Sequence, residues 1–397
     1  MKRNHKQQTL LLRGGLSALL YAAGCAQMPS DASPQSNAQV PMEHVIVASK
    51  PGMFCGWPAN NGAWTWNGGK EILVGYESGD FVEKVGHNIK GPVRQRLARS
   101  LDGGRTWQIE QPEPFVGSSG PVQPAPGGID FQQPEFVMRL IGNGYGPGDP
   151  LGSFFVSNDK GKNWLGPYRL GKLMDAPQLQ GMEFTGRTTY LTTGPRSCLF
   201  FLSARAKVNR TDRDKSFVAE TTDGGKSFHF VSWIVPLDNP YRAVMPAVAR
   251  LTDGTIVAAL RRRSPVSETE SCWVDAYGSK DNGRTWSFLS RVGDTGLFNG
   301  NPPALQAIKD GRLVCVYGDR TRRNMYARLS ADSGKTWGEE IVLRGDCPPD
   351  KYDDIDFGYP RLVQNHKGQL LAIYYWSTKE RKEPHIAGTF FDPRSIH

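Results

Sequence analysis

The stretch SKDNGRTW, residues 279–286, decides the fold because its pattern occurs five times along the chain. The shared rule is Ser/Thr-x-Asp-x-Gly-x-Thr-Trp, with small changes at the last two positions. The other copies are SLDGGRTW at 100–107, SNDKGKNW at 157–164, TTDGGKSF at 221–228 and SADSGKTW at 330–337. Successive aspartates are 57, 64, 58 and 51 residues apart, so the spacing varies while the motif hardly changes. Such regularity indicates one structural unit repeated along the chain.

The residue types of this octapeptide suit a tight turn between two strands. An aspartate can accept hydrogen bonds from backbone amides two or three residues ahead, which closes the turn. Glycine provides the positive φ that such a turn needs. The aromatic residue anchors the turn against a neighbouring sheet. These roles make the five aspartates structural, and we expect them to lie away from any catalytic pocket.

Each motif lies within a set of four short strands. In the fourth unit the expected strands are PAVARL (246–251), TIVAAL (255–260), CWVDAY (272–277) and SFLSR (287–291). Repeats of four short antiparallel strands predict the blades of a propeller. A sixth unit has no motif and only three strands, at 359–363, 370–375 and 386–391. We expect residues 44–49 to provide its outer strand. The sequence thus predicts an all-β, six-bladed β-propeller over residues 42–397.

The first 41 residues read differently. Residues 1–13 are basic, residues 14–24 are mostly apolar, and small residues precede Cys25, which is typical of a secretory signal of the lipoprotein type. Residues 1–24 are therefore expected to be removed and Cys25 to carry a lipid that anchors the exported protein to a bacterial membrane. An ordinary signal peptide is the alternative. Residues 25–41 are expected to form a linker, because they are rich in Ser, Asn, Gln and Pro.

Composition limits the partners. The formal net charge of +9 falls to +5 once the four basic residues of the signal are removed, and no nucleic-acid motif accompanies it. The remaining cysteines match no zinc spacing, so we expect no cofactor, no nucleic acid and a monomer. A disulfide between Cys55 and Cys347 is one alternative for their pairing. Calcium binding by Asp353, Asp354 and Asp356 is another alternative to a solvated acidic loop.

One face of the propeller is expected to carry the chemistry. If each motif joins the third and fourth strands, the opposite face collects the loops before first strands and those after second strands. Arginines, carboxylates and aromatic residues in these loops suit an acidic sugar, because arginine binds carboxylates at two points. The residues expected on this face include Trp57, Glu77, Asp80, His87, residues 130–135, Arg242, residues 261–263, Asn301, Arg320, Tyr359 and Arg361.

On these motifs the chain resembles the sialidase superfamily of six-bladed propellers over essentially its whole mature length. The resemblance implies a retaining exo-glycosidase with a tyrosine nucleophile, a partner carboxylate, an aspartate acid/base and three arginines that bind the substrate carboxylate. By position, Tyr359 would be the nucleophile and Asp80 the acid/base, with Glu77 as its competitor. Arg320 would be one arginine and one of residues 261–263 another, with Arg263 preferred. Further substrate-binding candidates are Arg361, Arg242, Trp57 and Asn301.

Two positions depart from the sialidase pattern. The segment CGWPANN (55–61) holds no arginine before the first blade, and YRAVMP (241–246) holds no carboxylate before the fourth. Glu268 or Glu270 could substitute for the missing carboxylate. Three functions therefore stay open. They are an exo-glycosidase for a terminal acidic sugar, not necessarily sialic acid; a lyase of uronate-containing polysaccharide that uses His87 and a tyrosine; and a glycan-binding lipoprotein without catalysis.

Overall fold

The computed structural model describes residues 41–112, 121–142, 151–207, 214–265, 267–349 and 356–395. The chain divides into two units, Met1–Gln39 and Val40–His397. The expected signal, Cys25 and nearly all of the expected linker lie outside the described residues, so their assignments stay predictions. In the described part of the chain, no helix has the length and apolar character needed to cross a membrane.

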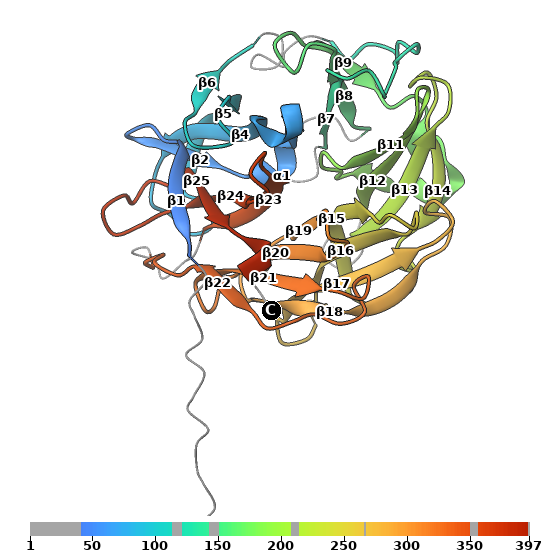
Figure 1. Ribbon diagram of the computed structural model, residues 1–397. Helices are drawn as coiled ribbons and strands as arrows, with labels where there is room; N and C mark the ends of the chain where they lie inside the picture. Colours follow the sequence, from blue (N-terminus) through green and yellow to red (C-terminus); the bar gives the residue numbers. More distant parts are fainter. Residues whose placement is uncertain are drawn as a thin grey trace, which may run out of the picture. The chain divides into compact units, whose positions relative to one another are not determined.

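The described strands form six antiparallel sheets that are arranged as a ring (Figure 1). This arrangement confirms the predicted all-β, six-bladed β-propeller. The first three blades contain β2 (Met53–Gly56), β3 (Ala63–Trp66), β4 (Glu71–Phe81), β5 (Ile89–Ser100) and β6 (Gln108–Glu110); β7 (Val137–Ile141), β8 (Ser153–Ser157) and β9 (Leu165–Arg169); and β10 (Met182–Phe184), β11 (Tyr190–Gly194), β12 (Ser197–Ala206), β13 (Lys215–Thr221) and β14 (His229–Trp233).

The last three blades are regular four-stranded sheets. They contain β15 (Arg242–Arg250), β16 (Ile256–Arg263), β17 (Cys272–Ser279) and β18 (Ser287–Gly296); β19 (Ala304–Ala307), β20 (Leu313–Asp319), β21 (Asn324–Ser330) and β22 (Ile341–Arg344); and β23 (Gly358–Gln364), β24 (Leu370–Trp376), β25 (His385–Phe391) and β1 (Glu43–Ala48). The described helices are short: α1 (Pro58–Asn61) and the 3₁₀ turns η1 (Asn67–Gly69), η2 (Leu173–Asp175), η3 (Pro177–Leu179) and η4 (Pro393–Ser395).

The ring closes as the sequence predicts, because a strand from the front of the chain completes the last blade. Strand β1 pairs antiparallel with β25, and Val45 lies opposite Gly388. Val47 and Ala48 of β1 are buried in the same apolar cluster as β25 and the first blade. The closure covers the edge that β25 would otherwise expose.

The repeated motif forms the expected turn. In the fourth blade, Oδ1 of Asp281 accepts hydrogen bonds from the amides of Arg284 (3.0 Å) and Thr285 (2.9 Å), and Oδ2 accepts one from the Thr285 hydroxyl (2.6 Å). Gly283 has a φ of 80°. Trp286 packs against Phe201 of the third blade, with 6.3 Å between ring centroids. Each motif therefore joins two strands and also fastens its blade to the preceding one.

The second blade differs from the expectation. Residues 130–135 were expected before a first strand on the pocket face, but they lie beside the motif turn. The side chain of Gln133 donates to the carbonyl of Asn158 (3.1 Å), and the amide of Lys160 donates to the carbonyl of Glu135 (2.9 Å). The expectation was wrong because β7, which follows this segment, starts beside the motif turn and ends opposite Ser153. It therefore takes the place of a second strand.

Two further expectations are corrected. Strand β4 continues to Phe81, so Glu77 and Asp80 lie within a strand, opposite Gly56 and Met53, and not in a loop. The disulfide alternative is wrong, because Cys55 and Cys347 are both free thiols.

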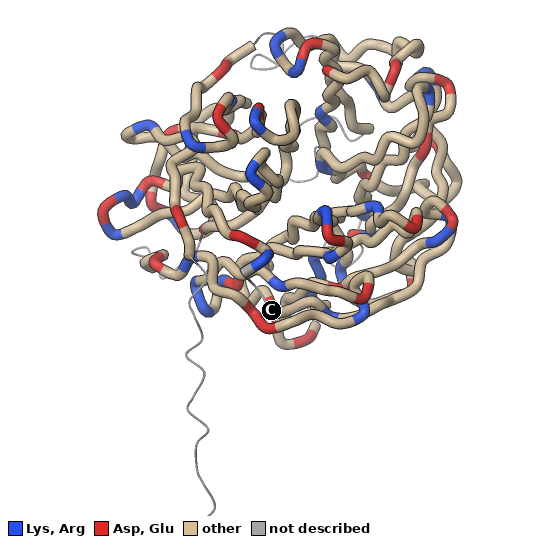
Figure 2. The backbone as a smooth tube through the Cα atoms, viewed as in Figure 1, with Lys and Arg blue, Asp and Glu red and all other residues tan. Residues whose placement is uncertain are grey.

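Charges of both signs are interspersed around the propeller (Figure 2). No group of three or more potential ligands that could hold a metal ion occurs in the described ranges, which include Asp356 but neither Asp353 nor Asp354.

Candidate active site

Three blades each have a residue with strained backbone in or directly after their first strand, which we call the inner segment of the blade. Trp57, Met245 and Tyr359 have φ values of 56°, 55° and 52°, and each directly precedes a proline. A residue before proline normally adopts extended backbone, and only a few per cent of non-glycine residues have positive φ. Strain of this kind clusters at functional sites.

The strain has a visible consequence for two of these blades. The register of β15 shifts between Val244 and Ala247, and that of β23 shifts between Gly358 and Arg361. A bulge of this kind re-aims the side chain of the extra residue. Met245 and Tyr359, which stand at these bulges, are thereby turned out of the regular alternation of their strands.

Tyr359 contacts an arginine from the fourth blade. Its hydroxyl accepts a hydrogen bond from Nη1 of Arg261 (3.1 Å), and the guanidinium carbon lies 5.7 Å from the ring centroid. Burial acts to raise the pKa of Tyr359, but the charges of Arg261, His87 and Arg320 outweigh it and lower the pKa to about 7. A phenol with such a pKa is partly ionised at neutral pH, and an ionised phenol is a nucleophile or a base.

The segment 297–301 positions both this tyrosine and its arginines. The carbonyl of Asn299 accepts from Nε (2.8 Å) and Nη2 (2.6 Å) of Arg261, and the carbonyl of Phe298 accepts from Nη1 of Arg320 (2.7 Å). Oδ1 of the fully buried Asn301 accepts from the amide of Tyr359 (3.1 Å). One short segment thus fixes three candidate catalytic or binding groups from three blades.

Glycine is required where Asn301 meets the sixth blade. Gly358 has a φ of 106°, and a Cβ at this position would lie 2.1 Å from Oδ1 of Asn301. Any side chain here would therefore push away the amide that fixes Tyr359.

A second group of polar residues lies where the sixth blade meets the first. Asp356 is buried, and Oδ1 accepts from Nδ1 of His87 (2.9 Å) and from the hydroxyl of Tyr375. Nη2 of Arg320 lies 3.9 Å from the same oxygen. Burial acts to raise the pKa of Asp356, but His87, Arg320 and Tyr375 hold this pKa below its usual range. Asp356 itself is therefore a buried, ionised carboxylate.

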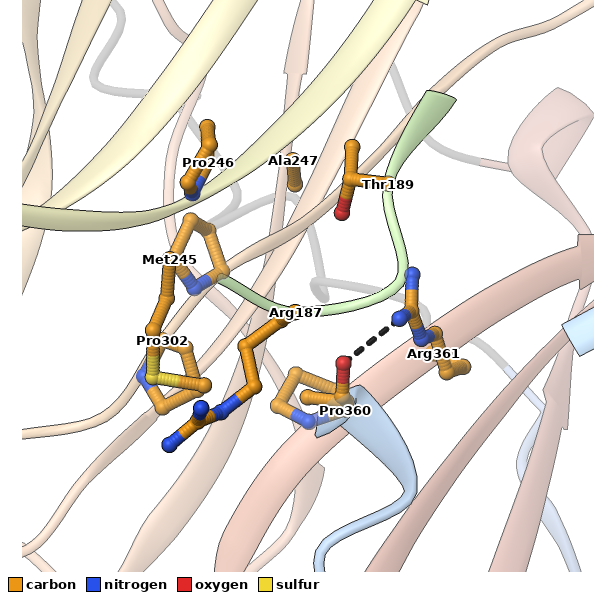
Figure 3. A pocket seen from close by; sticks show the side chains of 10 residues that line it. Arg187, Thr189, Met245, Pro246, Ala247, Pro302, Pro360 and Arg361 are labelled. Carbon is orange, nitrogen blue, oxygen red and sulfur yellow. Dashed lines mark hydrogen bonds between the residues drawn. The ribbon is translucent and has the colours of Figure 1, made fainter. Parts of the chain in front are cut away.

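A pocket opens where the inner segments meet (Figure 3). Arg187 comes from the break between β10 and β11 and extends towards Met245 and Pro302, and Arg361 of β23 also lines the pocket. Nε of Arg187 donates to Oδ1 of Asn60 (2.7 Å). Its charge also contributes to lowering the pKa of Tyr359. The lining residues are Ala59, Arg187, Thr189, Met245, Pro246, Ala247, Pro302, Pro303, Pro360 and Arg361.

The structure gathers several of the sequence-predicted residues around Tyr359. The charge of Arg320 helps to lower the pKa of Tyr359, and the side chain of Asn301 accepts a hydrogen bond from the Tyr359 amide. Trp57 lies edge-on to His87, with 4.9 Å between ring centroids. Arg361 lines the pocket, and its Nη2 donates to the carbonyls of Ala59 (2.5 Å) and Thr188 (2.7 Å). Their roles towards a substrate stay predictions.

Other predicted residues have different surroundings. Arg242 forms a buried ion pair with Asp214, at 2.7 Å. The charge of Glu77 acts on the buried Arg139 guanidinium, and Asp80 is exposed on β4. In the part of the chain that the structure describes, neither carboxylate makes a hydrogen bond or ion pair with Tyr359. Their assignment as acid/base residues stays a prediction.

The three consecutive arginines at 261–263 make different contacts. Arg262 is buried, and its Nε lies 3.1 Å from Oδ2 of Asp275. Arg263, preferred from the sequence as nearest to the loop, donates to Oδ1 of Asn299. Arg261 lies two residues before Arg263 on β16, so the two side chains point to the same face of the strand, and it is Arg261 that contacts Tyr359. Choosing among them required the register of β16.

The structure shows what surrounds the fourth blade's departure from the sialidase pattern. Met245 stands at the bulge of β15 in the fourth blade, and its Sδ lies 3.6 Å from Nη1 of Arg261. Glu270 accepts hydrogen bonds from the amides of Phe298 (3.2 Å) and Asn299 (2.8 Å), so its carboxylate holds the positioning segment 297–301. The neighbours of Tyr359 that lower its pKa are therefore cationic, and a thioether lies beside the arginine that contacts it.

The comparisons with known proteins agree with this architecture. Residues 129–372, more than half of the chain, match the family described as "BNR repeat-like domain". The chain belongs to this family, and its fold is that of a sialidase-like β-propeller. No curated protein matches the sequence.

Three solved structures show the same fold at low sequence identity. A protein of unknown function from Dyadobacter fermentans has a TM-score of 0.65 and 19% identity, covering 88% of this chain and 98% of that one. The Hadza microbial sialidase Hz136 has a TM-score of 0.58 and 17% identity, covering 87% and 66%. The α-L-arabinanase of Penicillium chrysogenum has a TM-score of 0.59 and 15% identity, covering 89% and 99%. At these levels of sequence identity the similarities show that the fold is shared.

Proposed function

We propose that this protein is a glycoside hydrolase that releases a terminal acidic sugar from a glycan, with Tyr359 as the nucleophile. The observation that carries the proposal is the contact between the Tyr359 hydroxyl and Arg261, which, together with the neighbouring charges, lowers the pKa of the phenol to about 7. The sialidase-like fold and its glycan-acting structural neighbours support the same class of reaction.

The proposed chemistry suits an anionic sugar. A carboxylate nucleophile would be repelled by the negative charge of such a substrate, whereas the charge that develops on the Tyr359 oxygen is balanced by the neighbouring arginines. Arg187, which lines the pocket, would bind the sugar carboxylate, since guanidinium groups pair well with carboxylates, and the charges of Arg261 and Arg320 would add to the attraction. The same arginines stabilise the phenolate, so binding and activation depend on one cationic cluster.

The test compares the chain beginning at residue 41 with its Tyr359→Phe variant on three substrate groups. These are aryl glycosides of N-acetylneuraminic acid, aryl glycosides of glucuronic acid, and polyuronates. Product mass and absorbance near 235 nm are recorded together. Release of an intact acidic sugar by the wild type, lost in the variant, would support the proposal and identify the sugar.

Two results would contradict it. An unsaturated uronate product would instead assign a lyase. Binding of these glycans without turnover would assign a binding protein. A matched control is Tyr168→Phe, because Tyr168 lies on β9 in the second blade. This variant should retain wild-type turnover.

A further inference from the structure

His87 is held in place across the junction between the first and sixth blades. It lies in the loop 82–88 between β4 and β5, and its Nδ1 contacts Oδ1 of Asp356 at 2.9 Å. The amide of the next residue, Asn88, donates to Oδ2 of the same carboxylate (3.3 Å). Both oxygens of Asp356 therefore fix this loop, one through the imidazole and one through the backbone.

This anchoring leaves the other ring nitrogen as the site of proton exchange. A carboxylate at Nδ1 sets the tautomer of neutral histidine, so that Nε2 carries the lone pair. In the described ranges Nε2 has no hydrogen-bond partner. The side chain of His87 is 47% exposed, whereas that of Asp356 is 3% exposed. The imidazole thus spans the boundary between a buried carboxylate and the open face of the site.

We propose that His87 is the acid/base residue that works together with Tyr359. The inference rests on the proposed function. In the first step the Tyr359 oxygen attacks the anomeric carbon, and the glycosidic C–O bond breaks. The electron pair of that bond goes to the leaving oxygen, which takes a proton from Nε2 of His87. In the second step Nε2 removes a proton from water, the water oxygen bonds to the anomeric carbon, and Tyr359 leaves with its electron pair.

The charges around the ring favour this division of roles. Groups that face His87 are Asp356, Arg320 and Tyr359, with Trp57 as an aromatic neighbour. Tyr375 binds the same oxygen of Asp356, and the loop of His87 also carries Glu83 and Lys84. Burial acts to lower the pKa of His87, but the charge and hydrogen bond of Asp356 raise it overall. The pKa of Tyr359 moves the opposite way. The positive charge of protonated His87 and the negative charge of ionised Tyr359 stabilise each other, which suits an acid that works beside a nucleophile.

The first experiment uses leaving groups of different quality. The probes are the 4-methylumbelliferyl and methyl glycosides of whichever acidic sugar the wild-type protein releases. An alkyl leaving group needs a proton, and general acid catalysis contributes typically 10²–10⁴-fold. His87→Gln should therefore lose about 100-fold or more in kcat/KM on the methyl glycoside. Because an aryl leaving group needs much less protonation, the loss on the 4-methylumbelliferyl glycoside should be about tenfold or less.

His366→Gln is the matched control, since His366 is exposed and lies beside the first motif turn. It should change neither rate. Equal losses on both glycosides in His87→Gln would overturn the assignment. So would a leaving-group dependence that appears in Asp80→Asn and not in His87→Gln. If the wild type hydrolyses no acidic glycoside, the proposed function fails first, and this inference fails with it.

A pH profile distinguishes a catalytic role from a structural one. As the acid, His87 must be protonated, so kcat/KM falls as pH rises through its pKa. Asp356→Asn removes the charge that raises this pKa, so the alkaline limb should move to lower pH. An alkaline limb that stays in place in folded Asp356→Asn protein would contradict the role of His87.

Discussion

The hydroxyl of Tyr359 on β23 lies 3.1 Å from Nη1 of Arg261 on β16, so two blades meet at one hydrogen bond. The other two nitrogens of the same guanidinium are bound to the carbonyl of Asn299. The arginine therefore cannot turn away from the phenol without losing backbone hydrogen bonds. The low pKa of the phenol is a consequence of this fixed geometry.

The ionisation of Tyr359 can be measured directly. In a pH titration followed by absorbance near 295 nm, one tyrosine should ionise at a pKa of about 7. This step should be absent in Tyr359→Phe. In Arg261→Gln this step should move to higher pH, because the positive charge that contacts and stabilises the phenolate is removed. A step near pH 7 that survives in Tyr359→Phe would show that another group titrates.

The same pKa predicts the acid limb of catalysis. A nucleophile that must be ionised loses activity as pH falls below its pKa, so kcat/KM should decline below about pH 7. Arg261→Gln should shift this limb to higher pH in parallel with the absorbance step. A limb that does not follow the absorbance step would contradict Tyr359 as the ionising group.

Glu270 should act through the segment it holds. Replacing it with alanine removes both acceptors from the amides of Phe298 and Asn299. We expect kcat/KM to fall while the free energy of unfolding drops by only about 2 kcal/mol, because each of the two lost hydrogen bonds contributes about 1 kcal/mol. Glu270→Gln, which retains an acceptor, should restore part of the rate. Glu268→Ala, an exposed neighbour, is the control and should match the wild type in both measurements.

The fold was predictable because it depends on local chemistry that repeats. Each motif turn closes on its own aspartate, as at Asp281, and the unpaired strand at the front of the chain had one blade left to complete. The second blade escaped this logic because its sheet has only three described strands.

The site was predictable only where position alone decides. Tyr359 and Arg320 follow from their places in the blade pattern. Arg187 was missed because it comes from a break between β10 and β11, for which Gly186 in residues 185–189 is a weak signal in the sequence. The pairing of His87 with Asp356 depends on ring closure, which brings the first and sixth blades together. Arg261 was passed over for Arg263 because depth along β16 depends on its register with β15.

Ring closure by β1 should contribute to stability. A chain that begins at residue 50 lacks β1 and exposes the edge of β25, so its Tm should fall by at least about 5 °C and aggregation should increase. A chain that begins at residue 41 should have the same Tm as one that begins at residue 25. As a point test, Val47→Ser should lower the Tm because Val47 is buried, whereas Ile46→Ser should not because Ile46 is 52% exposed. Equal Tm values for the chains starting at 41 and 50 would show that β1 is dispensable.

The motif aspartates should affect acid stability and not turnover. Asp223 accepts hydrogen bonds from the amides of Lys226 and Ser227 and from the Ser227 hydroxyl. Slight burial acts to raise the pKa of Asp223, but these hydrogen bonds outweigh it and lower the pKa to about 2. The pKa of aspartate in an unfolded chain is about 3.9. The stabilisation is therefore complete above about pH 4 and is lost as pH falls towards 2. Asp223→Asn should lower the Tm at pH 7 and flatten its decline below pH 4, with unchanged kcat/KM. A loss of activity in folded Asp223→Asn protein would contradict a purely structural role.

Arg187 offers the sharpest test of how the pocket binds an anion, because its guanidinium lines the pocket and also influences the phenol. A charge-assisted hydrogen bond contributes about 1.5–3 kcal/mol, so Arg187→Gln should raise KM for an acidic glycoside about tenfold or more. Binding of the sugar carboxylate should be affected in the ground state and the transition state alike, so kcat should change less than KM. The matched control is Arg196→Gln, since Arg196 is exposed and its carbonyl accepts from the amide of Gly224 in the third motif turn. It should leave both constants unchanged. If Arg187→Gln instead lowers kcat at constant KM, the arginine acts on Tyr359 and not on the substrate, and the absorbance titration of the same variant should then show the phenol ionising at higher pH.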